Sequence, residues 1–140
     1  MNQGELLTSF LIDLQRIFRT KIVPKELSYS QALAIVVIPD SGIEMSELAW
    51  VLGLENSTVT RLISRLESNG FVNREKSKTD KRAIIVFLKN KGLTVQKNIE
   101  NKSDSIGKKI FINDNQGQKE TALENLSLFQ WELKKTFLKR

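Results

Sequence analysis

The feature that most constrains this chain is a pair of short helical segments joined at Gly53 and followed by two strands with a cationic turn. Ser46 and Ser57 are the predicted N-caps of the two helices. Neither helix is long enough to bury a core alone, so the two must cross and pack, with Ala49 permitting close approach and Gly53 the sharp turn. The spacing therefore predicts a helix-turn-helix, in which the apolar residues that meet are Leu48, Leu52, Leu54, Val59 and Leu62.

Two strands are predicted after Gly70, which lies beyond the end of the second helix. They cover residues 71–75 and 83–88, and the polar segment 76–81 between them suits the tip of a hairpin. Asp80 lies two positions before Arg82, so its carboxylate is expected to fix the guanidinium in a bidentate pair.

On the N-terminal side, apolar residues at helical spacing predict a helix over about residues 5–20. Residues 28–38 are ambiguous, because Ser30 is a good N-cap while residues 35–38 are strongly β-branched. A helix is favoured there, ended by Pro39, and a turn follows at residues 40–42.

On the C-terminal side, a helix is predicted beyond residue 89, with Gly107 as a weak point in its interior. Residues 113–117 break the pattern, and a last helix carries Ala122, Leu126, Phe129, Leu133 and Phe137 with Trp131 beside them. The helix before the break presents Val95, Ile99, Ile106 and Ile110. The expected fold class is mostly α with a small β-hairpin, and 140 residues suit a single domain.

The net charge of +6 is concentrated in one segment. Residues 61–91 hold nine basic and three acidic side chains, so the rest of the chain is neutral overall. A polyanion-binding surface would have this pattern, and so would a solvated charged face.

Several functions are excluded by what the chain lacks. Without cysteine or histidine it has no disulfide, no thiolate or imidazole metal ligand and no histidine base. No glycine-rich phosphate loop, serine elbow or metal-ligand spacing is present, so an enzyme is not expected, and neither is a cofactor. Without a membrane-spanning run or an export signal, a cytoplasmic protein is expected.

The outward face of the second helix carries side chains suited to base edges and phosphates in a DNA major groove. Hydroxyl residues are poor helix formers in a helix interior, which argues against a face that is merely solvated. The hairpin tip would lie beside this helix and could follow the backbone into the minor groove. The alternatives are a solvated helix in an unrelated bundle and a solvated turn. The candidate DNA-binding residues are Ser57, Thr58, Thr60, Arg61, Ser64, Arg65, Arg74, Lys76, Lys78, Asp80, Lys81 and Arg82.

The segment from about residue 45 to 92 resembles the winged helix-turn-helix core of the MarR (multiple antibiotic resistance regulator) family. The resemblance is carried by Leu48-Ala49, Leu52-Gly53-Leu54, Ser57-Thr-Val-Thr-Arg61, Arg65-Leu66-Glu67, Asn69-Gly70-Phe71-Val72, Arg74, Asp80-Lys-Arg82, Leu88 and Gly92. It implies a DNA-binding lobe at about residues 28–92 and dimerisation helices at about residues 1–20 and 93–140.

The resemblance also implies a homodimeric regulator, most often a repressor, that binds a palindromic operator. The helix from Ser57 would enter the major groove, and Arg82, oriented by Asp80, would enter the minor groove. The bare apolar faces of the terminal helices independently call for a covering partner, with intramolecular packing as the alternative. A small aromatic or phenolic effector is implied, but nothing in the chain identifies it, and members that sense peroxide through cysteine or zinc through histidine are excluded as templates. A winged helix for protein contact or non-specific nucleic-acid binding, without effector control, is the alternative.

Overall fold

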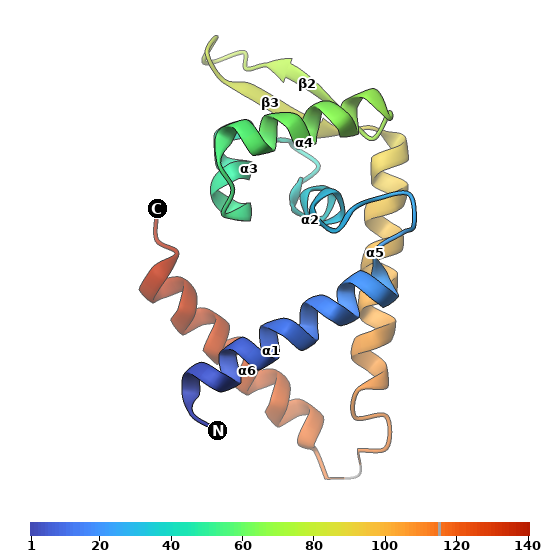
Figure 1. Ribbon diagram of the computed structural model, residues 1–140, viewed down its shortest axis with the longest axis vertical. Coiled ribbons are helices and arrows are strands. Elements are labelled where there is room, and N and C mark those ends of the chain that lie inside the picture. The colour runs from blue at the N-terminus through green and yellow to red at the C-terminus, as the bar shows by residue number, and fades with distance from the viewer. Residues whose placement is uncertain (115) are drawn as a thin grey trace. The chain divides into compact units, whose positions relative to one another are not determined.

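The computed structural model describes residues 1–114 and 116–140, which form two compact units, residues 1–103 and residues 104–140 (Figure 1). The helix α5 contributes to both units. The elements are α1 (Gln3–Ile17), a π-helical turn η1 (Phe18–Ile22), α2 (Tyr29–Val37), β1 (Ile43–Glu44), α3 (Met45–Leu52), α4 (Asn56–Ser68), β2 (Val72–Lys76), β3 (Ile84–Leu88), α5 (Asn90–Lys109) and α6 (Gln118–Phe137). The predicted class, mostly α with a small hairpin, is confirmed.

The core of the first unit lies where α2, α3, α4, the sheet and the N-terminal part of α5 meet. Leu48 of α3 and Val59 of α4, both predicted at the helix crossing, are fully buried. The predicted Leu52, Leu54 and Leu62 are only half-buried, and Ile63 of α4 is fully buried. Each such side chain contributes about 1.5–3 kcal/mol by leaving water. The largest fully buried side chains are Ile35, Ile38, Leu48, Ile63, Leu66, Ile99, Val59, Val72 and Val86.

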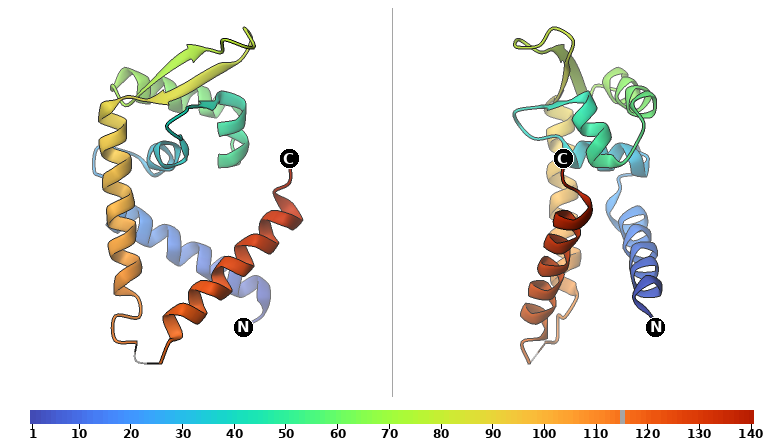
Figure 2. Two further views of the ribbon diagram at one scale, coloured as in Figure 1. Left: turned by 180° about the vertical axis from the view of Figure 1, so that it is seen from behind. Right: turned by 90° about the vertical axis from the view of Figure 1, so that its left-hand side faces the viewer.

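The sheet has three antiparallel strands in the order β1-β3-β2. The predicted hairpin is present: β2 pairs with β3 from Val72 opposite Leu88 to Lys76 opposite Ile84. The strand β1 pairs Ile43 with Val86 and was not predicted, because two residues are too short to show an alternating pattern. Figure 2 shows from two further directions that the hairpin reaches beyond α3 and α4.

The helix ends follow the sequence in part. Helix α3 ends at Gly53, whose φ of 67° is left-handed, as predicted. Residues 28–38 form a helix, but its N-cap is Ser28 in a capping box with Gln31, so the prediction of Ser30 was wrong. Ser46 and Ser57 are not caps either. Glu44 and Glu55 occupy the N-cap positions of α3 and α4 without a side-chain cap bond, and each serine lies inside the first turn.

Helix α5 is fastened to the rest of the first unit near its N-terminus. A Cβ at Gly92 would overlap the backbone oxygen of Phe71, so only glycine fits this approach. Farther along, Gln96 donates from Nε2 to the backbone oxygens of Ile35 and Ile38, both at 2.9 Å. These carbonyls belong to the last turn and C-cap of α2, where intrahelical donors run out. The side chain of Gln96 therefore caps α2.

The second unit comprises the end of α5, a connection and α6. Gly107 lies inside α5 as predicted, but Ile110 lies just beyond the helix. The predicted break at residues 113–117 is present in its described part, and residue 115 lies outside the described residues. Asp114 accepts hydrogen bonds from the backbone N–H groups of Gln116, Gln118 and Lys119, which lowers the pKa of its carboxyl.

The two terminal helices share an unusual property. Neither α1 nor α6 buries a residue, although both carry large apolar side chains. No described helix is both long enough and apolar enough to cross a membrane. The apolar faces of α1 and α6 are therefore available to a partner.

Candidate nucleic-acid interface

Helix α4 has one buried face and one exposed face. Val59, Ile63 and Leu66 are buried, whereas Ser57, Thr60, Arg61 and Arg65 are exposed and Thr58 and Ser64 are half-buried. This is the 3.6-residue periodicity of a helix that packs on one side only. The six candidate residues of α4 accordingly lie on or beside one solvent-facing surface.

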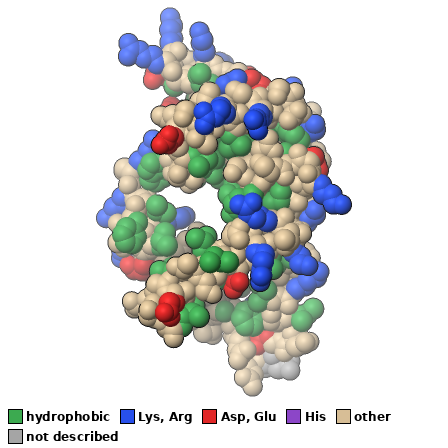
Figure 3. All heavy atoms as spheres, in the orientation of Figure 1, with side chains coloured by type: hydrophobic (Ala, Val, Ile, Leu, Met, Phe, Trp, Pro, Cys, Tyr) green, Lys and Arg blue, Asp and Glu red, His purple; other side chains and the backbone are tan. Residues whose placement is uncertain are grey.

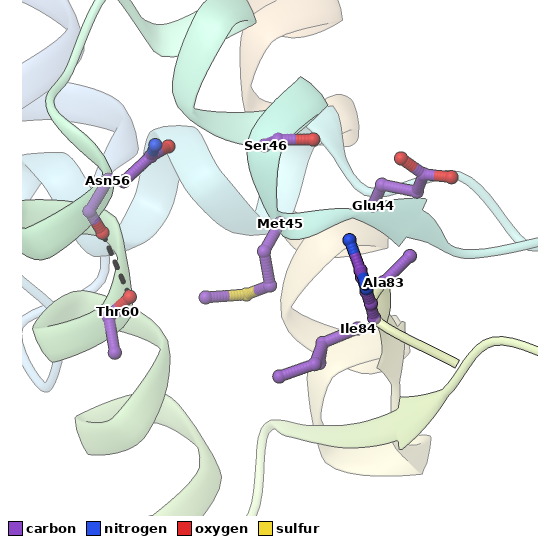
Figure 4. Close-up of a pocket in the computed structure, with 8 residues that line it drawn as sticks. Glu44, Met45, Ser46, Asn56, Thr60, Ala83 and Ile84 are labelled. Atoms are coloured by element: carbon purple, nitrogen blue, oxygen red, sulfur yellow. Dashed lines mark hydrogen bonds between the residues drawn. The ribbon is translucent and has the colours of Figure 1, made fainter. Parts of the chain in front are cut away.

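The hydroxyl groups on this face are engaged in different ways. Thr60 donates from Oγ1 to the backbone oxygen of Asn56 at 2.8 Å (Figure 4). Thr58 accepts a long contact of 3.5 Å from Nη2 of Arg61. Among the described residues, neither Arg61 nor Arg65 forms an ion pair with a carboxylate. Both guanidinium groups therefore keep donors available for an anion.

Cationic side chains gather over α4 and at the hairpin tip, as Figure 3 shows on one face. Lys76, Lys78, Lys81 and Arg82 are all exposed at the tip. No carboxylate of a described residue forms an ion pair with any of them. The tip is consequently a strongly positive projection beside the exposed face of α4.

The backbone of the tip is held by two side chains. Asp80 accepts from the backbone N–H of Arg82 at 3.0 Å, and Ser77 Oγ accepts from the N–H groups of Thr79 and Asp80 at 3.3 Å. The expected bidentate pair between Asp80 and the Arg82 guanidinium is therefore wrong. A short acidic side chain two residues before an N–H group closes an Asx turn instead. Asp80 shapes the turn from which Arg82 projects.

Arg74 has a partner that sequence reasoning missed. Its Nη2 donates to Oε1 of Glu67 at 2.9 Å and its Nε at 3.3 Å, while its backbone N–H donates to Oε2 at 2.9 Å. These bonds from Arg74 lower the pKa of the Glu67 carboxyl. Arg74 was predicted as a DNA contact, but in the structure its guanidinium binds Glu67 and so joins β2 to α4. Glu67 stands seven residues earlier, a spacing that carries no recognised local signal.

A second fastening joins α4 to α5. Lys91 donates from Nζ to the backbone oxygen of Asn69 at 2.8 Å, and the same nitrogen lies 4.3 Å from the centroid of the Phe71 ring. Asn69 is the C-cap of α4, where a positive charge is favoured by the helix dipole. Lys91 thus fixes the end of α4 that leads into the hairpin.

A hollow of about 200 Å³ lies between α3, α4 and the start of β3, next to the hairpin tip (Figure 4). It brings together Thr60 and Arg82, which are 22 positions apart in sequence. Its lining is completed by Glu44, Met45, Ser46, Asn56, Ala83 and Ile84. The two predicted groups, helix and hairpin, therefore border one recess.

A second hollow, of about 240 Å³, lies on the other side of α4. It is lined by Thr58, Arg61, Leu62 and Arg65 together with Leu54 and with Ser28, Ser30 and Gln31 at the start of α2. The involvement of α2 was not predicted, because residues distant in sequence meet here only through the fold.

The sequence around this surface is similar to known proteins. The profile of the MarR family matches residues 30–84. Over 78 residues the chain is 35% identical to the HTH-type transcriptional regulator TtmR of Methylorubrum extorquens, covering 55% of this chain and 40% of TtmR. Over 95 residues it is 28% identical to the HTH-type transcriptional regulator MgrA of Staphylococcus aureus, covering 66% of this chain and 65% of MgrA. The matches thus span less than two thirds of either relative.

Similarity of fold extends over nearly the whole chain. The crystal structure of Streptococcus pneumoniae FabT in complex with DNA matches with a TM-score of 0.77 and 24% identity, covering 97% of this chain and 96% of that one. The crystal structure of a mutant MarR from Escherichia coli matches with a TM-score of 0.79 and 21% identity, covering 93% of this chain and 97% of that one. At these identities the likeness establishes a shared winged-helix fold.

Proposed function

This chain belongs to the MarR family, and we propose that it is a homodimeric, sequence-specific DNA-binding repressor of transcription that a small molecule releases from its operator. The observation that carries the proposal is the exposed cationic surface formed by α4 and the hairpin tip. Six of the nine basic residues of segment 61–91 lie on this surface, and among the described residues the guanidinium groups of its arginines at positions 61, 65 and 82 form no ion pair with a carboxylate. The function would be exercised in the cytoplasm, and no catalytic step is part of it.

In the proposed complex α4 enters the major groove. Arg61 is exposed and can make a bidentate contact with O6 and N7 of guanine, the commonest specific contact of arginine with DNA. Ser57, Ser64 and Arg65 flank it and would reach base edges or phosphates. The helix would supply most of the sequence preference.

The hairpin has a different role in the same complex. Arg82 would enter the minor groove, where a narrow groove deepens the negative potential, and Lys76, Lys78 and Lys81 would contact phosphates. These contacts depend on charge and groove width more than on base identity. The hairpin would therefore raise affinity with little effect on sequence choice.

Dimerisation is supported by the uncovered faces of the terminal helices. Phe10 on α1 is 47% exposed and Trp131 on α6 is 63% exposed, and both helices also carry exposed leucines. A second copy would cover them, because large exposed apolar patches mark interaction surfaces. Two lobes would then meet half-sites of a palindrome about 10 base pairs apart. An aromatic or phenolic effector is supported by the family resemblance alone.

The proposal is tested with Arg61→Ala and Arg82→Ala, titrated against the operator and random duplex at two salt concentrations. Arg61→Ala should cost about 1–3 kcal/mol on the operator and relax preference at one position in each half-site. Arg82→Ala should weaken binding to both DNAs and lower the log–log salt slope by about 0.9 per subunit. Lys102→Ala, an exposed cation on α5 outside this surface, is the matched control and should have little effect.

The same titration separates the alternative functions. Equal losses on operator and random duplex for Arg61→Ala would indicate a non-specific nucleic-acid binder. Unchanged binding in both arginine variants would indicate that this surface is solvated and does not contact the DNA. Absence of DNA binding by the wild type would favour a winged helix that serves protein contact.

A further inference from the structure

We propose that Thr60 selects a thymine in each half-site through its methyl group rather than through its hydroxyl. The proposal rests on the proposed function, since it requires α4 to lie in the major groove. It assigns a specificity role to one side chain from the hydrogen bond that this side chain makes within its own helix.

The hydroxyl of Thr60 has already committed its only hydrogen. Oγ1 donates to the backbone oxygen of Asn56, one turn earlier, at 2.8 Å. This bond fixes the side-chain rotamer, because threonine in a helix chooses between its allowed rotamers by bonding a carbonyl of the preceding turn. Figure 4 shows the methyl group on the side of Thr60 away from that hydrogen bond. Thr60 is exposed in the free protein, and it borders the recess that it shares with Arg82.

What remains on Thr60 is a methyl group and one side of an acceptor oxygen. Guanine presents two acceptors in the major groove, N7 and O6, and requires donors that Thr60 no longer has. Adenine also presents an acceptor at N7. Thymine presents a C5-methyl group, for which an apolar contact with a threonine methyl is a known pairing. Thymine is met through the methyl group without breaking the internal hydrogen bond, whereas the N4 donor of cytosine or the N6 donor of adenine would have to reach the remaining side of Oγ1.

The neighbouring hydroxyl residues are arranged differently. Thr58 accepts from Arg61, and no described residue forms a hydrogen bond with the side chain of Ser64. Ser64 also lacks a methyl group. On this face of α4, the combination of an engaged hydroxyl hydrogen and a free, rotationally fixed methyl is found at Thr60.

The chain supplies a matched control on α5. Thr94 donates from Oγ1 to the backbone oxygen of Asn90 at 3.1 Å, the same four-residue arrangement in the first turn of a helix. Thr94 is likewise exposed but lies outside the proposed DNA surface. Its variants report what the intrahelical bond alone contributes to folding.

The experiment begins with selection of preferred duplexes from a random pool by the wild-type dimer. Thr60→Val, which keeps a methyl in place, and Thr60→Ser, which removes it, are then titrated against the selected duplex. They are also titrated against the same duplex with deoxyuridine, which lacks the C5-methyl, at each selected thymine in turn. Thr94→Val and Thr94→Ser are measured in parallel, with circular dichroism to verify folding.

At one thymine of each half-site, deoxyuridine should weaken wild-type binding about fourfold per contact, which corresponds to about 0.8 kcal/mol for one buried methyl. Thr60→Val should bind within about twofold of wild type and keep this sensitivity to deoxyuridine. Thr60→Ser should lose about the same fourfold per contact and become indifferent to deoxyuridine there. The Thr94 variants should change affinity by less than twofold.

Three outcomes overturn the assignment of Thr60 alone. The first is a selected duplex that tolerates deoxyuridine at every thymine. The second is a Thr60→Val variant that loses tenfold in affinity while Thr60→Ser binds normally. The third is a preference for cytosine at the base that Thr60 contacts, because its N4 donor would meet the hydroxyl oxygen. If selection returns no preferred sequence at all, the proposed function fails and the Thr60 proposal fails with it.

Discussion

The carboxylate of Glu67 should stabilise the folded protein by joining α4 to the hairpin. It accepts three hydrogen bonds from Arg74, two from the guanidinium and one from the backbone N–H. Glu67→Ala removes all three and leaves the guanidinium without its partner. We expect this change to destabilise the protein more than the loss of an ordinary surface ion pair.

The magnitude follows from exposure. A hydrogen bond to a charged group contributes about 1.5–3 kcal/mol when it is well shielded. The side chains of Arg74 and Glu67 are 28% and 36% exposed, so solvent screening reduces their pairing toward the 0.2–1 kcal/mol typical of surface pairs. We expect Glu67→Ala to lower the free energy of unfolding by about 1–2 kcal/mol. Glu67→Gln should cost about half as much, because its amide oxygen can still accept from the Arg74 backbone.

The effect should also depend on pH in a definite direction. The bonds from Arg74 hold the pKa of Glu67 below its ordinary value of 4.5. A lowered pKa in the folded state means that the stabilisation is fully present above pH 4.5 and is lost as the pH falls through the folded-state pKa. The difference in unfolding free energy between wild type and Glu67→Ala should therefore shrink as the pH is lowered from about 5 to 3.

Urea denaturation at equal protein concentration measures this difference at each pH. Glu75→Ala is the control, since Glu75 is an exposed carboxylate on the same strand as Arg74 that accepts one neutral hydrogen bond, from Asn73. A Glu67→Ala variant as stable as Glu75→Ala at pH 7 would refute the role of the carboxylate. A destabilisation that stays constant down to pH 3 would show that lost packing, rather than the ion pair, is responsible.

Three further outcomes are expected. Gln96→Leu should lower the free energy of unfolding by about 1–2 kcal/mol in urea denaturation, because two carbonyls at the end of α2 lose their donor. In the same assay Gly92→Ala should cost about 2–3 kcal/mol, because the added methyl is forced against the Phe71 carbonyl. Gly53→Ala should cost about 1 kcal/mol, because it meets only the strain of a left-handed backbone. Equal losses for the two variants would contradict the structure. Asp114→Ala should lower helicity by circular dichroism at pH 7, and the difference from wild type should shrink as the pH falls below 3.8. The reason is that backbone N–H groups lower the Asp114 pKa, so its hydrogen bonds to them are lost as the pH falls through that folded-state pKa.

The sequence by itself determined the helix-turn-helix and its orientation. Apolar residues at helical spacing fix which side of α4 is buried, so the burial of Val59 and the opposite cationic face could be assigned without coordinates. Gly53 likewise indicated the end of α3, because the left-handed conformation common after the last residue of a helix favours glycine. These features depend on residues near each other in sequence, and local rules are sufficient for them.

Local rules failed at helix starts and at short strands. Serine is a residue type preferred at N-caps, yet α3 and α4 begin one residue before Ser46 and Ser57. At α3 the backbone leaves β1 directly, since Glu44 is paired with β3 opposite Ile85. The pairing partner lies about forty residues away, so no local pattern could place the start of this helix.

Only the tertiary structure decided which charged residues are free to act. Arg74 and Arg82 look equivalent in the sequence, because both are arginines in the predicted hairpin. The fold gives Arg74 a carboxylate on α4 and leaves Arg82 at the edge of a recess with Thr60. The physical reason is that ion pairs and side-chain caps join groups brought together by packing, as Gln96 does for α2, and periodicity along the chain does not encode such distances.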